Sequence, residues 1–311
     1  MNNPTTPTSG EIETGQTRSG FVALIGAPNA GKSTLVNQLV GTKVSIVTHK
    51  VQPTRALVRG IFIENNAQIV LVDTPGIFRP KRRLDRAMVT TAWGGAKDAD
   101  IILVLLDAQG GLNENAEALL ESMKNVRQKK VLVLNKVDRV DPPVLLDLAK
   151  KANELVTFDQ TFMISALNGS GCKDLAKFLA ETVPNGPWYY PEDQISDMPM
   201  RQLAAEITRE KLYLRLHEEL PYSSTVETER WEERKDGSVR IEQVIYVERE
   251  SQKKIVLGHK GETIKAIGQA ARKEISEILE QNAHLFLFVK VRENWGNDPE
   301  RYREMGLDFP T

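Results

Sequence analysis

Short runs of consecutive apolar residues alternate with longer segments of helical periodicity from Phe21 to Thr182. Because these runs are apolar on successive positions rather than alternate ones, each predicts a strand buried on both faces, as in a mainly parallel sheet. The helical segments between them supply the crossover connections that parallel strands require. We therefore predict an α/β domain with helices on both faces of its sheet. The predicted strands cover residues 21–25, 69–72, 101–106, 131–134 and 161–165, and the predicted helices cover residues 32–39, 114–128, 142–156 and 173–182.

The pattern changes after a proline-rich segment, in which Pro184, Pro187, Pro191 and Pro199 fall within sixteen residues. Proline is unfavourable inside helices and strands, so residues 184–200 are predicted to form a linker. The order of elements after the linker mixes helices with extended segments, which predicts a separate α+β domain. This domain comprises a helix at 201–219, extended segments at 224–232 and 239–248, a short apolar run at 254–257, a helix at 262–280 and an alternating strand at 284–291.

These patterns divide the 311 residues into two domains, as expected when one domain usually has about 100 to 200 residues. The N-terminal residues are polar and lack the apolar stretch of a signal peptide, so they predict a disordered tail. The longest strongly apolar run has six residues, far fewer than the ~20 needed to cross a bilayer. The predicted units are a disordered tail at 1–18, the α/β domain at 19–183, the linker at 184–200, the α+β domain at 201–292 and a C-terminal tail at 293–311.

Charge and cysteine content exclude several classes of function. The 41 Lys and Arg residues nearly cancel the 42 Asp and Glu residues, which leaves a net charge of −1. No global field therefore attracts this chain to nucleic acid or membrane, and any basic footprint must be local. The single cysteine, Cys172, excludes an internal disulfide framework, and four scattered histidines give no zinc-binding pattern.

A glycine-rich segment directly after the first predicted strand matches the phosphate-binding pattern G-x-x-x-x-G-K-[ST]. Glycines let the backbone curl so that successive N–H groups and the helix N-terminus face a chain of phosphates. Lys32 would neutralise the β- and γ-phosphates, and the Ser33 hydroxyl would ligate magnesium. The weaker alternative is a glycine-rich turn before an ordinary helix. The segment comprises Gly26, Ala27, Pro28, Asn29, Ala30, Gly31, Lys32 and Ser33, and Thr34 follows it.

Polar residues after two later strands indicate which base the nucleotide carries. They fall at the carboxyl edge of the sheet, where open parallel sheets bind ligands. A carboxylate such as Asp138 can accept hydrogen bonds from both N1–H and the exocyclic amine of guanine, whereas adenine has no such pair of donors. Backbone N–H groups at the end of the next strand could meet the guanine O6, although both segments also suit ordinary strand-end turns. The residues are Asn135, Lys136 and Asp138 after one strand and Ser165, Ala166 and Leu167 at the end of the next.

Two further segments complete a predicted magnesium and γ-phosphate site. Asp73, Thr74, Pro75 and Gly76 directly follow the second predicted strand. Asp73 would hold magnesium through a water, and the Gly76 N–H would contact the γ-phosphate, although D-T-P-G is also good turn chemistry. Thr54 lies in a segment without clear periodicity, which suits a loop that orders when nucleotide binds. Thr54 is therefore our candidate for a second hydroxyl ligand of magnesium.

In this order, the five motifs resemble those of the TRAFAC-class P-loop GTPases. The resemblance implies binding of GTP and GDP and hydrolysis of the β–γ bond by water, with Mg²⁺ as cofactor and Lys32, Thr54 and Gly76 as catalytic groups. Ile77 stands where many small GTPases have a water-orienting Gln, so we expect a slow intrinsic rate, near ~10⁻⁴ s⁻¹ or below. Asn29 could help to hold K⁺ against the phosphates, as in similar GTPases with a hydrophobic substitution, or could merely suit the turn.

A GxxG turn in the C-terminal half is the second candidate site. Such a turn brings backbone and a helix N-terminus close to a phosphate chain and leaves room for a single strand of RNA. Residues 249–273 carry seven Lys and Arg residues against two Glu residues, which is the local basic footprint expected of an RNA groove. The alternative is a solvated helix with ordinary surface lysines. The predicted RNA-binding residues are Lys253, Lys254, Gly258, His259, Lys260, Gly261 and Lys265.

The order of helix, strands, GxxG turn, helix and strand resembles a type-2 KH domain. Joined to the GTPase half, it is similar to the Era family of ribosome-associated GTPases over roughly residues 19–295. The resemblance implies a cytoplasmic monomer that binds the 3′ end of small-subunit ribosomal RNA and assists maturation of the small ribosomal subunit, with peripheral contact to the inner membrane in some relatives. Two alternatives stay open: a GTPase signalling or membrane adaptor whose C-terminal domain binds protein or lipid, and a P-loop ATPase.

Overall fold

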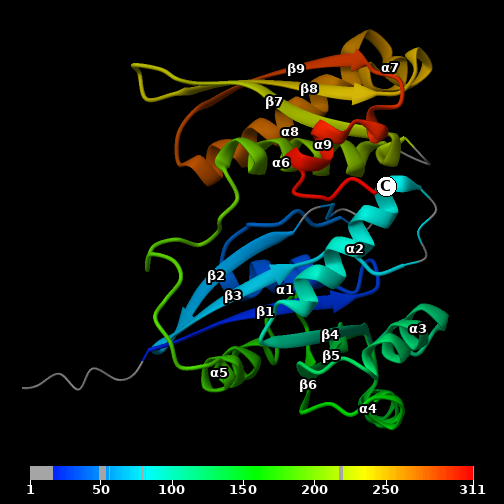
Figure 1. Ribbon diagram of the computed structural model, residues 1–311. Coiled ribbons are helices and arrows are strands. Elements are labelled where there is room, and N and C mark those ends of the chain that lie inside the picture. The colour runs from blue at the N-terminus through cyan, green and yellow to red at the C-terminus, as the bar shows by residue number, and fades with distance from the viewer. Residues whose placement is uncertain are drawn as a thin grey trace, which may run out of the picture.

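The computed structural model describes residues 17–48, 54–55, 57–78, 80, 82–216 and 220–310. Nearly all of the predicted N-terminal tail, residues 1–16, therefore lies outside the described residues. Two domains lie one above the other, and the C-terminal end of the chain returns to the boundary between them (Figure 1). Each domain is built around its own sheet.

The sheet of the N-terminal domain is parallel except at one edge, which confirms the predicted α/β class. Its strand order is β2-β3-β1-β4-β5-β6, and only the pairing of β2 with β3 is antiparallel. Strands β1, β3, β4 and β5 are buried on both faces, as the continuous apolar runs predict, whereas in β6, at the edge of the sheet, only Ile164 is buried. The strands are β1 (Arg18–Gly26), β2 (Val58–Glu64), β3 (Ala67–Asp73), β4 (Ile101–Asp107), β5 (Lys129–Asn135) and β6 (Gln160–Ile164).

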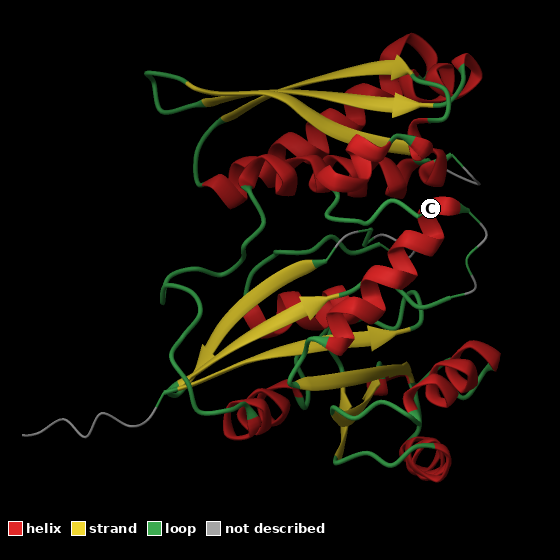
Figure 2. Cartoon of the chain, viewed as in Figure 1, coloured by secondary structure: helices red, strands yellow, loops and turns green. Residues whose placement is uncertain are grey.

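Helices cover both faces of this sheet (Figure 2). One face packs against α1 and α5 through Leu35, Val36, Leu175 and Leu179. The opposite face packs against α2, α3 and α4. Helix α3 ends earlier than the sequence predicts, at Met123 rather than residue 128. The helices are α1 (Lys32–Val40), α2 (Arg83–Lys97), α3 (Glu114–Met123), α4 (Pro142–Leu155) and α5 (Cys172–Thr182).

The linker runs along the antiparallel edge of the sheet. The Ile61 N–H of β2 donates to the Ile195 carbonyl at 2.8 Å, and the Gln68 side chain bonds the backbone of Tyr189 and Tyr190. Because the Ile61 bond uses the open side of β2, the linker covers this edge of the sheet.

In its described residues the C-terminal domain combines the strands β7, β8 and β9 with the helices α6, α7 and α8, as an α+β class predicts. The strand order is β7-β8-β9, with β7 and β8 antiparallel and β8 and β9 parallel. Helices α6 and α8 pack on the side of this sheet that faces the N-terminal domain (Figure 1). The apolar run at 254–257 lies inside helix α7, which the sequence did not predict. The elements are α6 (Met200–Arg215), β7 (Ser224–Glu233), β8 (Val239–Val247), α7 (Glu250–Leu257), α8 (Glu262–Leu279) and β9 (Ala283–Val291).

The segment after β9, predicted as a C-terminal tail, carries helix α9 (Pro299–Glu304) and contacts both domains. Tyr302 and Leu307 are buried against Ala87 and Met88 of α2. The Trp295 indole N–H donates to the Ser223 carbonyl of the C-terminal domain at 3.0 Å. This segment therefore connects the two domains. In the described part of the chain, no helix combines the length and apolar character needed to cross a membrane.

Candidate nucleotide site and GxxG turn

A cavity of about 340 Å³ lies at the carboxyl ends of the central strands of the N-terminal domain. Residues from all five predicted nucleotide motifs line it. Four lining residues, Ile46, Val47, Thr48 and Arg139, were not predicted from the sequence. The predicted residues on the cavity wall are Pro28, Asn29, Gly31, Lys32, Ser33, Thr34, Thr54, Thr74, Gly76, Asn135, Lys136, Asp138, Ser165, Ala166 and Leu167.

The other predicted residues, Gly26, Ala27, Ala30, Asp73 and Pro75, do not line the cavity. Lys32 Nζ donates to the carbonyls of Gly26 and Ala27, each at 3.1 Å, so the ammonium lies inside the curled loop. Burial lowers the pKa of Lys32 to about 8, although the nearby Asp73 carboxylate acts in the opposite direction. A cation held in this way is poised to gain stabilisation from a bound phosphate.

The loop needs glycine at position 31. Gly31 has a φ of 96°, and a Cβ there would lie 2.1 Å from Nδ2 of Asn135. Asn29 also has a positive φ, 64°, a region that Asn enters more easily than most residues. The backbone can therefore curl around an anion at a helix N-terminus.

Hydroxyl and carboxylate oxygens meet below the loop, where the sequence predicts magnesium. Ser33 Oγ donates to Asp73 Oδ2 at 2.6 Å and lies 2.9 Å from Thr54 Oγ1. Ser45 Oγ also donates to Asp73 Oδ2, at 2.7 Å, a contact that the sequence did not predict. Burial raises the pKa of Asp73, and its hydroxyl donors oppose that rise.

The Asp73 carboxylate has spare capacity for a further partner. Its Oδ1 atom is buried, and within the described part of the chain it has no hydrogen-bond partner. Oxygen ligands and a partly satisfied carboxylate are what Mg²⁺ with its water shell requires. Ser33, Thr54 and Asp73 therefore fit a magnesium ion.

Asn135 connects the phosphate-binding loop with the Ser165–Ala166–Leu167 segment, which is predicted to meet the base. Its Nδ2 donates to the Ala30 carbonyl at 2.8 Å, and its Oδ1 accepts from the Ala166 N–H at 2.9 Å. Lys136 has a φ of 66°, and its Nζ pairs with Asp107 Oδ2 at 2.6 Å. These contacts hold the start of the turn that carries Asp138 on the cavity wall.

The turn after Asp73 passes close to the phosphate-binding loop. The Ile77 N–H donates to the Gly26 carbonyl at 3.0 Å, and a Cβ on Gly76 would lie within 2.9 Å of Pro28 backbone atoms. Ile77 itself packs against the apolar cluster beneath α2, α3 and α4. Its side chain therefore contributes to packing and offers no hydrogen bond to a water.

The GxxG residues form the turn between α7 and α8, at the end of β8 opposite the β7–β8 hairpin. Gly258 has a φ of 74°, and a Cβ there would lie 2.2 Å from Thr263 Oγ1. Gly261, with a φ of 81°, precedes the first residue of α8. Of the other predicted RNA-binding residues, Lys254, His259, Lys260 and Lys265 are exposed and Lys253 is half-buried. The turn thus presents positive charge at a helix N-terminus.

Comparison with known proteins places both domains in one family. Residues 21–136 match the family described as 50S ribosome-binding GTPase, and residues 219–296 match the KH domain family. GTPase Era of Brucella suis biovar 1 is 92% identical over 311 residues, which covers 100% of both chains. GTPase Era of Rhizobium meliloti is 76% identical over 294 residues, or 94% of each chain.

Solved structures agree with the sequence relatives. A crystal structure of an Aquifex aeolicus Era variant bound to GDP·AlF4⁻ has a TM-score of 0.88 and 38% identity, and the match covers 93% of this chain and 99% of that one. A crystal structure of Era in complex with MgGDPNP and nucleotides 1506–1542 of 16S ribosomal RNA matches with the same TM-score, identity and coverage. From these matches and its two-domain fold, the chain belongs to the Era family, P-loop GTPases that carry a C-terminal KH domain.

Proposed function

We propose that this GTPase is a switch that binds the 3′ end of small-subunit ribosomal RNA through its KH domain and assists maturation of the small ribosomal subunit in the cytoplasm. One observation carries the proposal: a cavity lined by all five nucleotide motifs lies in the same chain as an exposed GxxG turn. The related Era structure with MgGDPNP and a 16S ribosomal RNA segment supports it.

The cavity suits a guanine nucleotide with magnesium. Asp138 would accept from N1–H and the exocyclic amine of guanine, and Lys32 would bind the β- and γ-phosphates. Ser33 and Thr54 would ligate magnesium directly, and Asp73 would hold it through water. When bound, magnesium neutralises charge on the phosphates. The Gly76 N–H would contact the γ-phosphate from the side on which Pro28 already touches that turn.

Hydrolysis by this chain is proposed to be slow without assistance, because Ile77 cannot orient the attacking water. We further propose that the Asn29 carbonyl oxygen helps to hold a potassium ion against the phosphates. The supporting observations are that Asn29 lines the cavity and that its φ is positive, within the curled loop.

Replacing K⁺ with Na⁺ is therefore expected to lower the rate of GTP hydrolysis by at least about tenfold, because the smaller Na⁺ does not fit a site formed for K⁺ and the stabilising charge beside the phosphates is then missing. The rate is followed as phosphate release at constant ionic strength. Asn29→Gly tests the potassium role most directly, because glycine tolerates the positive φ and the substitution removes only the side chain. This variant should respond equally to both ions. Equal wild-type rates in K⁺ and Na⁺ would exclude the potassium role.

Replacing Lys260 with Asp is expected to weaken RNA binding by about tenfold or more at low salt and to reduce the dependence of affinity on salt. Nucleotides 1506–1542 of 16S ribosomal RNA serve as the probe, measured by filter binding. Lys235→Asp, in the hairpin at the far end of the sheet, makes the same charge change away from the GxxG turn. It should bind nearly as well as the wild type. If Lys260→Asp has no effect, or if the wild type does not bind RNA, an adaptor whose C-terminal domain binds protein or lipid becomes the better account.

A further inference from the structure

The segment that joins α1 to β2 contacts both domains, and two adjacent residues in it, Thr54 and Arg55, have different roles. Thr54 Oγ1 lies 2.9 Å from Ser33 Oγ in the proposed magnesium site. The next residue, Arg55, points away from that site and into the KH domain. Because adjacent Cα atoms are about 3.8 Å apart, a fixed Arg55 leaves Thr54 little freedom to move.

Arg55 is held by KH-domain residues and by the segment that follows the domain. Its side chain is buried, with the whole residue 6% exposed. Nη1 donates to the Ser224 carbonyl at 3.0 Å, and Nη2 donates to the Tyr213 hydroxyl at 3.0 Å. The guanidinium also lies 5.4 Å from the centre of the Trp295 ring. A buried guanidinium loses much stabilisation when it leaves such acceptors and rings, so this contact fixes Arg55 and restricts the adjacent Thr54.

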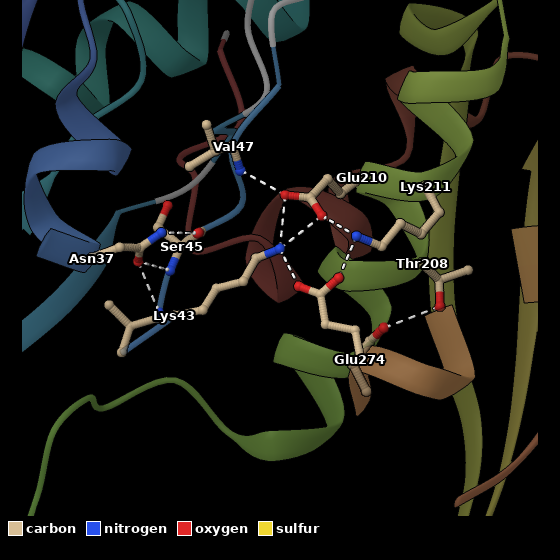
Figure 3. A network of polar contacts seen from close by, with 10 residues as sticks. Asn37, Lys43, Ser45, Val47, Thr208, Glu210, Lys211 and Glu274 are labelled. Carbon is tan, nitrogen blue, oxygen red and sulfur yellow. Dashed lines mark hydrogen bonds and ion pairs between the residues drawn. The ribbon is translucent and has the colours of Figure 1, made fainter. Parts of the chain in front are cut away.

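A second contact holds the other end of the same segment (Figure 3). Glu210 of α6, 3% exposed, accepts from the Val47 N–H at 2.8 Å. It also pairs with Lys43 Nζ at 2.7 Å, and Lys43 contacts Glu274 of α8 as well. Ser45, which donates to Asp73, lies between these two anchored residues. Two KH-domain helices therefore fix the part of the segment that contacts the proposed magnesium carboxylate.

From these contacts we infer that Arg55 is a positioning residue for GTP hydrolysis, and that the KH domain supplies its anchor. Docking of the KH domain holds Arg55 in place. Arg55 in turn keeps the Thr54 hydroxyl in the position where it would ligate magnesium beside the γ-phosphate. When the domains separate, Thr54 is released and hydrolysis slows. This inference rests on the proposed role of Thr54 as a magnesium ligand.

Arg55→Ala tests the inference in the full-length chain. We expect kcat for GTP hydrolysis to fall at least about tenfold. The Mg²⁺ concentration that gives the half-maximal rate should rise about tenfold, because residues that hold a metal ligand in place typically change metal affinity by that factor or more. Affinity for GDP should stay within about twofold of the wild type, because GDP has no γ-phosphate and relies on the P-loop and Asp138. Loss of GDP affinity in proportion to kcat would show a merely structural role and overturn the inference.

Arg59→Ala is the matched control. Arg59 lies in β2 and also makes a contact beyond the N-terminal domain, from Nη1 to Asp197 Oδ2 of the linker at 2.6 Å. Unlike Arg55, it is not adjacent to a residue that lines the cavity, so its loss should leave kcat and the Mg²⁺ dependence unchanged. Tyr213→Phe removes one acceptor for Arg55 and keeps the ring, so kcat should fall in the same direction but less. Unchanged kcat in both Arg55→Ala and Tyr213→Phe would overturn the inference.

The double variant Thr54→Ala with Arg55→Ala separates this inference from the proposed function. If Arg55 acts through Thr54, the double variant should hydrolyse GTP at the rate of Thr54→Ala alone. Multiplied effects in the double variant would overturn the positioning role. A wild-type rate in Thr54→Ala would instead contradict the proposed magnesium ligand, on which the inference depends.

Discussion

Asp138→Asn is expected to weaken GTP and GDP binding by on the order of 10³-fold or more, and to allow xanthine nucleotides to bind in their place. The carboxylate of Asp138 can accept both donors of guanine, whereas an amide offers one acceptor and one donor. Xanthine has a second carbonyl in place of the exocyclic amine, and the amide N–H₂ can donate to it. Titration calorimetry with GDP and with xanthosine diphosphate measures both changes.

Asp141→Asn makes the same chemical change three residues further along the chain, at the residue before α4. Asp141 is exposed and does not line the cavity. Its replacement should leave the Kd for GDP within about twofold of the wild type, as for most surface changes. If Asp138→Asn and Asp141→Asn bind GDP equally well, Asp138 does not contact the base.

Lys32→Met is expected to lower the affinity for GTP by about a hundredfold or more, because charge-assisted hydrogen bonds to two phosphates are lost. The same change should leave the nucleotide-free protein at least as stable as the wild type at pH 7. Burial lowers the pKa of Lys32 from 10.5 to about 8, so keeping the ammonium charged in the folded chain costs free energy. Urea unfolding at pH 7 and nucleotide titration measure the two effects.

The direction of the pH dependence follows from that pKa. The unfolded chain holds the Lys32 proton more tightly than the folded chain does. The free-energy cost of the buried ammonium is therefore fully present below pH 8, and it declines as the pH rises towards 10.5. The stability of the wild type relative to Lys32→Met should therefore rise over this range, by at most about 3 kcal/mol. Bound phosphates raise the pKa again, so the affinity of the wild type for GTP should fall above pH 8. If Lys32→Met is less stable at pH 7, the hydrogen bonds to Gly26 and Ala27 outweigh the cost of the buried charge.

The sequence predicts the strands that have a clear apolar pattern, and it misses elements whose pattern is interrupted or whose burial depends on distant parts of the chain. The strands β1, β3, β4 and β5 are apolar on successive residues, and the structure confirms them. Strand β2 was missed because Arg59 and Gly60 interrupt its apolar residues and its outer edge meets only the linker. Helix α2 was missed because adjacent glycines, Gly94 and Gly95, and two threonines are weak helix formers. Its buried stripe packs partly against the C-terminal segment, a contact that local pattern cannot predict.

The residues of the candidate site likewise divide into those that local motifs predict and those that only contacts in the folded chain reveal. Motif residues meet at one edge of the sheet because parallel strands end there, and the sequence predicts that convergence. Ser45 and Arg139 were missed because each belongs to no recognised spacing. Arg55 and Glu210 were missed because their importance depends on a contact between domains, which lies between residues more than 150 positions apart.

The most direct measurement is calorimetric titration of the nucleotide-free wild-type protein with GTP and, separately, ATP in excess Mg²⁺. If Asp138 and the P-loop together form a guanine nucleotide site, GTP should bind at least about 10³-fold more tightly than ATP. Equal affinities for the two nucleotides would contradict the central claim, whatever the RNA affinity of the KH domain.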